Sequence, residues 1–308
     1  MPFPRWGVAL PARNEARRLP GALEALDLAA RQACGAVRVT VLADRCIDAT
    51  TAAARDAATR LRHIRVRVVL RENGLETVGA ARAAACEYAL DGLGEQPGAL
   101  LLTTDADARV HEETFARMEQ AFAQGADLCC ARLDPVADPF DSASPAAIRR
   151  ARADAARRAL IRRLAARRTP GCGAPCLHDD YGGAGLAFTG AAYRRLGGFA
   201  PVSRDEDRRL ARLAERAGLT IDRTSRARVA VLARRKGRAP GGMAAALAEA
   251  EAGGDRQVER AGLTLERLGV GEDVLDVIEA RPAQLEPIAD ALAGLRQALR
   301  APRRALAA

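Results

Sequence analysis

Short apolar runs alternate with alanine-rich amphipathic stretches along the first half of the chain. The apolar runs, each about as long as a buried strand, are Trp6–Leu10, Val37–Leu42, Ile64–Leu70, Ala99–Thr103 and Ala126–Ala131. The amphipathic stretches that separate them are Glu15–Ala33, Asp48–Leu61, Thr77–Leu90 and Glu112–Ala123. Strands and helices that alternate at this spacing predict an α/β fold, with a mostly parallel sheet flanked by helices.

The pattern changes after Asp134. Residues Asp134–Pro145 are rich in Pro, Asp and Ser and predict a loop. The segments predicted to follow are an arginine-rich helix at Arg149–Arg168, a loop at Thr169–Gly185, a strand at Ala187–Thr189, and helices at Ala191–Leu196 and Arg208–Ala217. From about Gly241 onward the sequence indicates short amphipathic helices. We therefore expect a main domain over residues 1–235 and a helical C-terminal extension over residues 236–308.

Two aspartates follow the most apolar of the predicted strands. Asp105 and Asp107 come directly after Leu100–Thr104, and a strand's two-residue repeat predicts that both carboxylates leave one face. Two carboxylates aimed at one point repel each other unless a cation lies between them, and oxygen ligands suit Mg²⁺ or Mn²⁺. The cation would in turn hold a diphosphate. The alternative is that one aspartate caps a helix beginning near Glu112.

Other polar residues follow the neighbouring predicted strands. They are Pro11-Ala12-Arg13-Asn14-Glu15, Ala43-Asp44 and Arg71-Glu72-Asn73-Gly74. Ligands of parallel α/β sheets bind beyond the carboxyl ends of the strands. Acids and arginines gathered at that edge are what a nucleotide with a metal requires.

Charge and composition narrow the function classes. The chain carries a net charge of +9, but nine arginines and one acid fall between Arg149 and Arg168, so almost the whole excess lies in one segment. Aromatic residues make up only 3% of the chain, which leaves few platforms for stacking bases. We therefore expect no nucleic-acid partner. The segment is read as a solvated helix face, with contact to an anionic membrane and neutralisation of donor phosphates left open.

Cysteine usage and hydropathy indicate the compartment. Seven cysteines at irregular spacings fit a reducing environment, and no apolar run approaches the length of a membrane span. The N-terminus lacks the apolar core of a secretory signal. We expect a cytoplasmic protein.

Six sequence blocks, taken together, resemble the bacterial and other family 2 glycosyltransferases, which have the Rossmann-like GT-A fold. They are Val8–Glu15, Val41–Thr50, Gly79–Arg82, Thr104–Asp107, Gly183–Phe188, and Gly197–Phe199 with Glu206-Asp207. The resemblance covers roughly residues 6–232 in the family's order. It implies transfer of a sugar from a UDP-, GDP- or dTDP-linked donor to a small-molecule, glycan or lipid-linked acceptor.

The resemblance also implies roles for individual residues. Residues 1–133 form the nucleotide-sugar-binding half, where the donor contacts are Pro11, Ala12, Arg13, Glu15, Asp44, Arg82, Asp105 and Ala106. Asp107 and Asp105 are the implied ligands of the metal, Mn²⁺ or Mg²⁺. Residues 134–235 form the acceptor and catalytic half, where Asp207, or Glu206 beside it, matches the base of inverting members. The chain has no Gln-x-x-Arg-Trp motif after this pair, which favours transfer of a single sugar over polymer synthesis.

Several readings stay open at this point. His178 is a metal ligand or acceptor-side residue, or an ordinary loop histidine. Glu206 and Asp207 are also explained as acids at a helix N-terminus, stabilised by the helix dipole. A retaining transferase of the same fold, a nucleotidyltransferase and a basic nucleic-acid-binding module are the rival functions. The C-terminal helices are expected to cover the acceptor side or to form a homodimer.

Overall fold

The computed structural model describes residues 5–72, 74–94, 98–149, 151–152, 155, 181–223, 226–237 and 243–252. The chain divides into two compact units. The first comprises Met1–Val136, Asp180–Leu232 and Arg238–Gly242, and the second comprises Ala137–Asp179, Ala233–Gly237 and Met243–Ala308. The domain boundary predicted at residue 235 stays a prediction, as do the two halves of the main domain.

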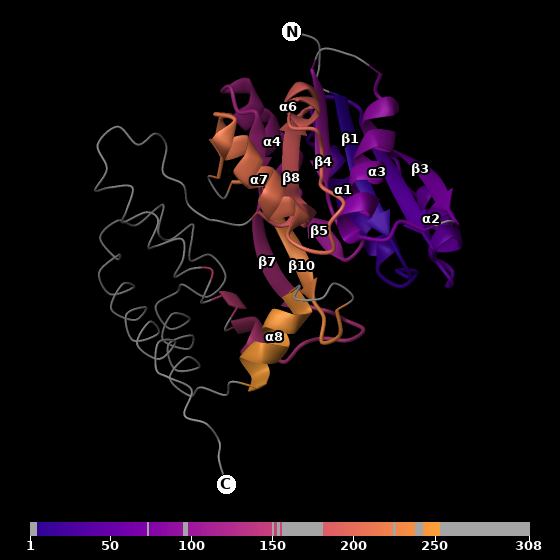
Figure 1. The fold of residues 1–308 in the computed structure, drawn as a ribbon. Coiled ribbons are helices and arrows are strands. Elements are labelled where there is room, and N and C mark those ends of the chain that lie inside the picture. The colour runs from indigo at the N-terminus through magenta and orange to yellow at the C-terminus, as the bar shows by residue number, and fades with distance from the viewer. Residues whose placement is uncertain are drawn as a thin grey trace, which may run out of the picture. The chain divides into compact units, whose positions relative to one another are not determined.

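A seven-stranded sheet organises the first unit (Figure 1). Its strands are β1 (Arg5–Ala12), β2 (Val37–Asp44), β3 (Ile64–Arg71), β4 (Ala99–Thr103), β6 (Leu128–Cys130), β8 (Leu186–Thr189) and β9 (Ile221–Asp222). Their order across the sheet is β3-β2-β1-β4-β8-β6-β9. Strands β1 to β4 are parallel, whereas β8 runs antiparallel to both of its neighbours. The predicted mostly parallel α/β sheet is confirmed.

The register of the parallel strands brings their carboxyl ends to one edge. Ala12 of β1 pairs with Ala43 of β2, and Ala9 of β1 pairs with Thr103 of β4. The residue after β4, Thr104, donates its N–H to the Ala9 carbonyl at 3.0 Å. Strand β1 therefore separates the ends of β2 and β4, and the residues that follow all three strands emerge at the same edge.

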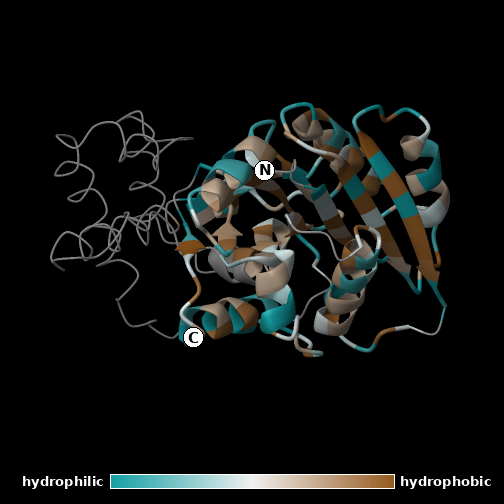
Figure 2. Ribbon diagram, turned by 90° about the horizontal axis from the view of Figure 1, so that it is seen from above, coloured by the Kyte–Doolittle hydropathy of each residue, from teal (hydrophilic) through white to brown (hydrophobic). Residues whose placement is uncertain are grey.

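Helices cover both faces of this sheet. They are α1 (Leu19–Ala30), α2 (Thr50–Ala58), α3 (Val78–Asp91), α4 (Thr114–Ala123), α6 (Gly190–Arg195) and α7 (Glu206–Arg216). Leu100 and Leu102 of β4 lie in one core cluster with residues of α1, α2 and α4. Leu101, between them, lies in the other cluster with residues of α3, α6 and α7. Strand β4 is accordingly apolar on both faces, and in Figure 2 the strands of the sheet carry brown segments interrupted by teal and pale residues.

The first unit's strands lead into a second, three-stranded sheet, each strand of which follows a strand of the first sheet along the chain. It consists of β5 (Ala108–Val110), β10 (Arg228–Ala233) and β7 (Arg132–Ala137) in that order. The prediction of a loop over Asp134–Pro145 is therefore wrong at its start, because Asp134 belongs to β7. Its carboxylate accepts hydrogen bonds from Arg132 and Arg228, so strand neighbours override the local loop signal of Asp and Pro.

The second unit has a small core of its own. Ala143, Ala147, Ile148, Ala233 and Leu247 are buried together, and Leu247 belongs to α8 (Met243–Ala252). Most of the predicted arginine-rich helix at Arg149–Arg168, the loop with His178 and nearly all of the C-terminal extension lie outside the described residues. In the described part, every helix is too short or too polar to cross a bilayer.

Candidate active site

The loops after β1 and β2 are joined by hydrogen bonds to their backbone N–H groups. The N–H of Glu15 donates to Thr50 Oγ1 at 2.7 Å, and that of Ile47 donates to Asn14 Oδ1 at 2.8 Å. Asn14 and Arg45 both have positive φ, at 52° and 48°. Strained backbone persists only where surrounding contacts hold it, and it clusters at functional sites. These contacts fix the edge at which a nucleotide is expected.

The residues predicted to bind the nucleotide differ in exposure. Pro11 and Ala12 end β1, Arg13 is exposed, and Glu15 is buried. Asp44, the last residue of β2, is only 4% exposed. Its Oδ1 accepts the N–H of Leu75 at 3.1 Å, and Arg45 Nε lies 3.5 Å from Oδ2. Asp44 is thus a strand-end acid whose carboxylate is oriented by two neighbours.

The paired aspartates lie in the turn between β4 and β5. Strand β4 ends at Thr103, and the Asp105 carbonyl accepts the N–H of Ala108 at 3.0 Å. Asp105 and Asp107 are therefore turn residues, and the expected two-residue strand repeat does not extend to them. Ala106 between them is buried, whereas both aspartates are partly exposed. The helix-capping alternative is wrong for both, because α4 begins at Thr114 and its N-cap is Glu113.

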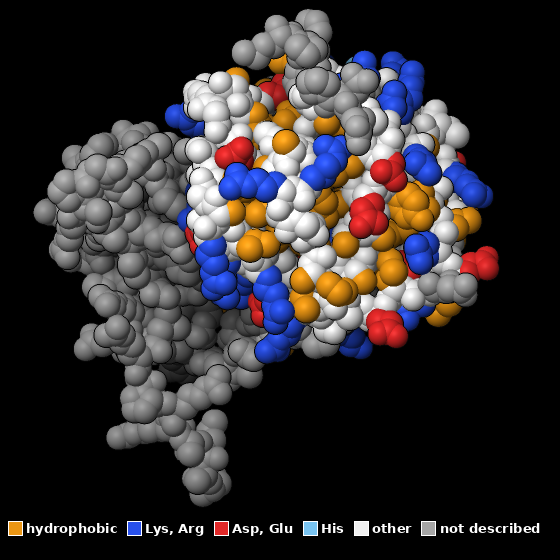
Figure 3. Space-filling view, turned by 45° about the horizontal axis from the view of Figure 1, so that its top comes forward, with side chains coloured by type: hydrophobic (Ala, Val, Ile, Leu, Met, Phe, Trp, Pro, Cys, Tyr) orange, Lys and Arg blue, Asp and Glu red, His pale blue; other side chains and the backbone are white. Residues whose placement is uncertain are grey.

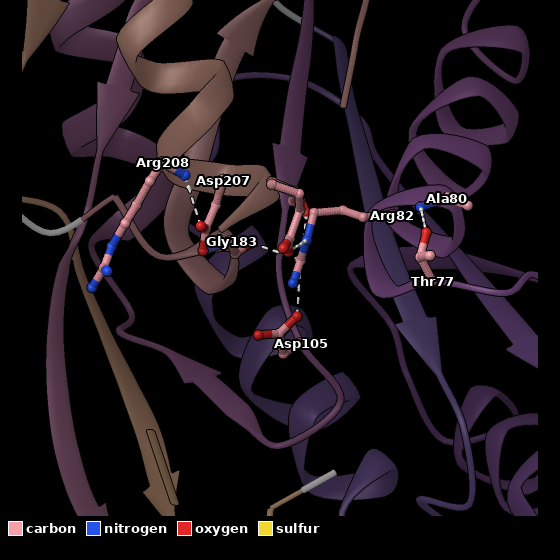
Figure 4. Close-up of polar contacts among 9 residues, drawn as sticks. Thr77, Ala80, Arg82, Asp105, Gly183, Asp207 and Arg208 are labelled. Atoms are coloured by element: carbon pink, nitrogen blue, oxygen red, sulfur yellow. Dashed lines mark hydrogen bonds and ion pairs between the residues drawn. The ribbon is translucent and has the colours of Figure 1, made fainter. Parts of the chain in front are cut away.

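Arg82 of α3 is the centre of the site (Figure 4). Its side chain is almost completely buried, and its guanidinium binds groups from three distant segments. Nε donates to Glu206 Oε1 at 3.1 Å, while Nη1 lies 2.9 Å from Asp105 Oδ1. Nη1 also contacts Thr103 Oγ1 and the Gly183 carbonyl, each at 3.0 Å. These four groups all belong to the protein, and the predicted contact of Arg82 with the donor stays a prediction.

Burial and charge determine the ionisation of this cluster. Burial by itself would lower the pKa of Arg82, but Asp105, Glu206 and Asp207 raise it overall, so the guanidinium stays charged. Burial raises the pKa of Glu206, an effect that Arg82 opposes and the nearby Asp207 reinforces. The cluster therefore contains a permanent cation and a carboxylate whose ionised form is penalised.

Asp207 lies in the first turn of α7 and is held at both carboxylate oxygens. Oδ2 accepts the N–H of Gly183 at 2.8 Å, and Oδ1 accepts the N–H of Arg208 at 2.7 Å. The residue before α7, Asp205, has a φ of 58°. The contact with the Arg208 N–H is the one expected if Asp207 is simply an acid at a helix N-terminus. The first contact, to Gly183, comes from outside the helix and connects Asp207 to Arg82.

The site thus gathers Asp105, Glu206 and Asp207 around one guanidinium, with Asp107 two residues from Asp105. Among the described residues, no three His, Cys, Asp or Glu side chains form a group that could hold a metal ion by themselves. Mg²⁺ and similar cations are commonly bound by one or two carboxylates together with substrate phosphates. Asp105 and Asp107 fit that second arrangement, because they are oxygen donors and partly exposed. His178 lies outside the described residues.

Two residues of the site received no role from the sequence. Thr103 is the last residue of β4, and Gly183 begins the 3-10 helix η1 (Gly183–Gly185). Gly183 falls in one of the six blocks, but its contacts are made by its backbone. A sequence pattern can mark such a position without indicating which groups its N–H and carbonyl bind.

The surface carries charges of both signs. On the described part of the face in Figure 3, Lys and Arg side chains are interspersed with Asp, Glu and apolar ones. A continuous basic field is the electrostatic footprint expected of nucleic-acid binding. The nucleic-acid alternative gains no support from this face.

Comparisons with known proteins identify the family and the fold. The model of the family "Glycosyltransferase like family 2" matches residues 4–246. A structure of residues 1–349 of TarS from S. aureus, in complex with UDP-GlcNAc, superposes with a TM-score of 0.53 at 13% identity, covering 96% of this chain and 81% of that chain. A search of curated proteins found no match.

A second solved structure is the mannosyltransferase PcManGT from Pyrobaculum calidifontis, in complex with GDP-Man and Mn²⁺. It has a TM-score of 0.50 at 20% identity, covering 97% of this chain and 88% of that chain. At these identities the two structures establish the fold. The family match over most of its length shows that the chain belongs to glycosyltransferase like family 2 and is a glycosyltransferase, and its fold is of the GT-A type.

Proposed function

We propose that this enzyme transfers a single sugar from a nucleotide diphosphate donor to a hydroxyl acceptor, with inversion and with a divalent cation. The observation that carries the proposal is the chain of contacts Asp105–Arg82–Gly183–Asp207. It connects a candidate metal and donor acid at the end of β4 to a candidate base at the start of α7. The two chemical roles of an inverting transfer therefore lie within one bonded cluster.

The proposed donor site extends along the carboxyl edge of the sheet. Strand β1 lies between β2 and β4, so about 10 Å separates these two strands across the sheet. Along the strands, Asp44 lies beyond the end of β4, because Ala43 is level with Ala12 whereas Thr103 is level with Ala9. A nucleoside placed near Asp44 would direct its diphosphate toward Asp105 and Asp107. Pro11 and Ala12 end β1, the strand between, and Arg13 and Glu15 follow it. Ala106 lies between the two aspartates. We assign these residues to the walls of the donor site.

The proposed metal site consists of Asp105 and Asp107, with Mn²⁺ or Mg²⁺ as the ion and His178 as a further candidate ligand. When bound, the cation would supply Lewis-acid stabilisation of the negative charge on the leaving diphosphate. The Mn²⁺ in the PcManGT structure supports this choice. So does the excess of carboxylates around Arg82, because repulsion among them decreases when a cation is added.

Asp207 is the better candidate base of the acidic pair. Glu206 is only 4% exposed and binds Arg82, whereas Asp207 is partly exposed. A carboxylate whose two oxygens are oriented by backbone N–H groups can accept the proton of an acceptor hydroxyl as it attacks. Such a positioned base typically contributes about 10²–10⁴-fold. The acceptor is a small molecule, a glycan or a lipid-linked sugar, the last with help from Arg149–Arg168 at a membrane surface; a homodimer stays a prediction.

Nucleotide binding is the first test. Thermal shift with UDP, GDP and dTDP, each with Mn²⁺ and with chelator, should show stabilisation by one nucleotide that requires the metal. Stabilisation that is equal with chelator contradicts the metal assignment. Tight, strongly salt-dependent oligonucleotide binding without nucleotide binding would instead favour the nucleic-acid module. NMR of the product then reads the anomeric configuration, and retention would replace the inverting mechanism by the retaining one.

A further inference from the structure

The backbone of Gly183 lies between two charged side chains. Its carbonyl accepts from Arg82 Nη1 at 3.0 Å, and its N–H donates to Asp207 Oδ2 at 2.8 Å. The backbone of one residue, through the two peptide groups on either side of its Cα, therefore connects a buried cation to the proposed base, as Figure 4 shows. The residue comes from η1, far in sequence from both partners.

Glycine is required at this position by space. The φ of Gly183 lies outside the left-handed region, so any residue type could adopt its backbone conformation. A Cβ at residue 183, however, would lie 2.4 Å from Arg82 Cζ and 2.6 Å from Nε and Nη2. No real Cβ makes contacts that short. Residue 183 is thus in direct contact with the guanidinium plane.

Movement of the Arg82 side chain away from a methyl group at residue 183 would cost considerable free energy. A flexible arginine end normally yields to an added methyl group, but this one is buried and bonded to Asp105, Thr103 and Glu206 as well as Gly183. Moving the guanidinium would break several of those contacts in a buried site, where unsatisfied polar groups are costly. The methyl group would instead displace the Gly183 backbone, including the N–H that Asp207 accepts.

We propose that Gly183 is a positioning residue: its backbone, held at the carbonyl by Arg82, presents the N–H that orients the Asp207 carboxylate for proton transfer. This inference rests on the proposed function, because it requires Asp207 to be the base. It assigns a role to a glycine, which acts through its backbone alone. Misplacement of a reacting group by about 1 Å costs on the order of a hundredfold in rate, so the effect of a small displacement is measurable.

The test compares Gly183→Ala with Gly92→Ala, a matched control. Gly92 follows α3, the helix that carries Arg82, and a Cβ there meets nothing closer than 3.5 Å. Nucleotide release from UDP-GlcNAc and GDP-Man is measured with Mn²⁺. We expect Gly183→Ala to lower kcat by about tenfold to a hundredfold with little change in the donor KM, and Gly92→Ala to match the wild type. Equal kcat in the two variants would overturn the proposal.

A second pair of variants separates positioning from misfolding. Arg82→Lys keeps the positive charge but removes the guanidinium plane that the new methyl group would meet. The loss caused by Gly183→Ala, in kcat and in thermal stability, should be smaller in the Arg82→Lys background than in the wild type. Fully additive losses would refute the contact-based account. Asp207→Asn tests the proposed function separately from the role of Gly183. An active Asp207→Asn enzyme would contradict the proposed base. An inactive Asp207→Asn enzyme together with a fully active Gly183→Ala enzyme would contradict only the role of Gly183.

Discussion

Arg82 binds Glu206 with an Nε–Oε1 distance of 3.1 Å across 124 residues of sequence. The contact joins α3, which packs on the first four strands, to the first residue of α7. Since the same guanidinium also binds Asp105, the end of β4 and the start of α7 are held by one side chain. The donor side and the base side of the proposed reaction therefore depend on a single buried cation.

Replacement of Arg82 by Met should destabilise the fold strongly. Met fills much of the volume but leaves Glu206, only 4% exposed, without its cation. Breaking a buried ion pair by removing one partner costs about 3–5 kcal/mol. We expect a loss of that size in the free energy of unfolding, measured by urea denaturation. Arg82→Lys, which keeps the positive charge, should lose clearly less free energy of unfolding. Equal losses in the two variants would mean that the charge of Arg82 does not stabilise the fold.

Much of the fold could be predicted from hydrophobic periodicity. The apolar run at Ala99–Thr103 is β4 with the same bounds, and Thr77, where a helix was expected to begin, is the N-cap of α3, its side chain accepting the Ala80 N–H. Short edge elements were not predicted. The edge strands β5 and β9 have three and two residues, and the middle strand of the second sheet, β10, was missed as well; their pairing depends on distant partners rather than on their own sequence.

The site was predicted as a set of residue types but not as a geometry. The charged side chains that the motifs indicated, Asp105, Arg82, Glu206 and Asp207, do lie together. The sequence could not indicate that Arg82 would be buried among protein acceptors, because burial depends on how α3, β4 and α7 pack. Nor could it predict the bonds of Gly183, since every residue except proline carries the same backbone donor and acceptor.

Replacement of Asp107 by Ala should strongly weaken metal-dependent nucleotide binding and leave the fold intact. Asp107 is a partly exposed turn residue, so its side chain contributes little to the core. Loss of one of two carboxylates should weaken Mn²⁺-dependent binding of the preferred nucleoside diphosphate by at least about tenfold. Isothermal titration with and without Mn²⁺ measures this, and circular dichroism checks the fold. Unchanged affinity would remove Asp107 from the metal site.

Replacement of Asp207 by Asn should separate binding from chemistry. The amide is close in shape and keeps one oxygen to accept an N–H, but it cannot take a proton from the acceptor. We expect kcat to fall by about 10²–10⁴-fold, with the donor affinity close to that of the wild type. Single-turnover transfer and equilibrium nucleotide binding give the two values. A decrease of only a few-fold would assign the base to another residue.

Replacement of Glu206 by Gln should change how stability depends on pH. Burial raises the pKa of Glu206 in the folded protein above its unfolded value of about 4.3. A group with a raised folded pKa stabilises the fold fully below the unfolded pKa, and this contribution is lost as the pH rises through the folded pKa. The wild-type free energy of unfolding, minus that of Glu206→Gln, should therefore decrease from about pH 4 to neutral pH. Urea denaturation of both proteins across this range measures the difference; a difference that is constant or increases with pH would mean that Glu206 is ionised in the fold without penalty.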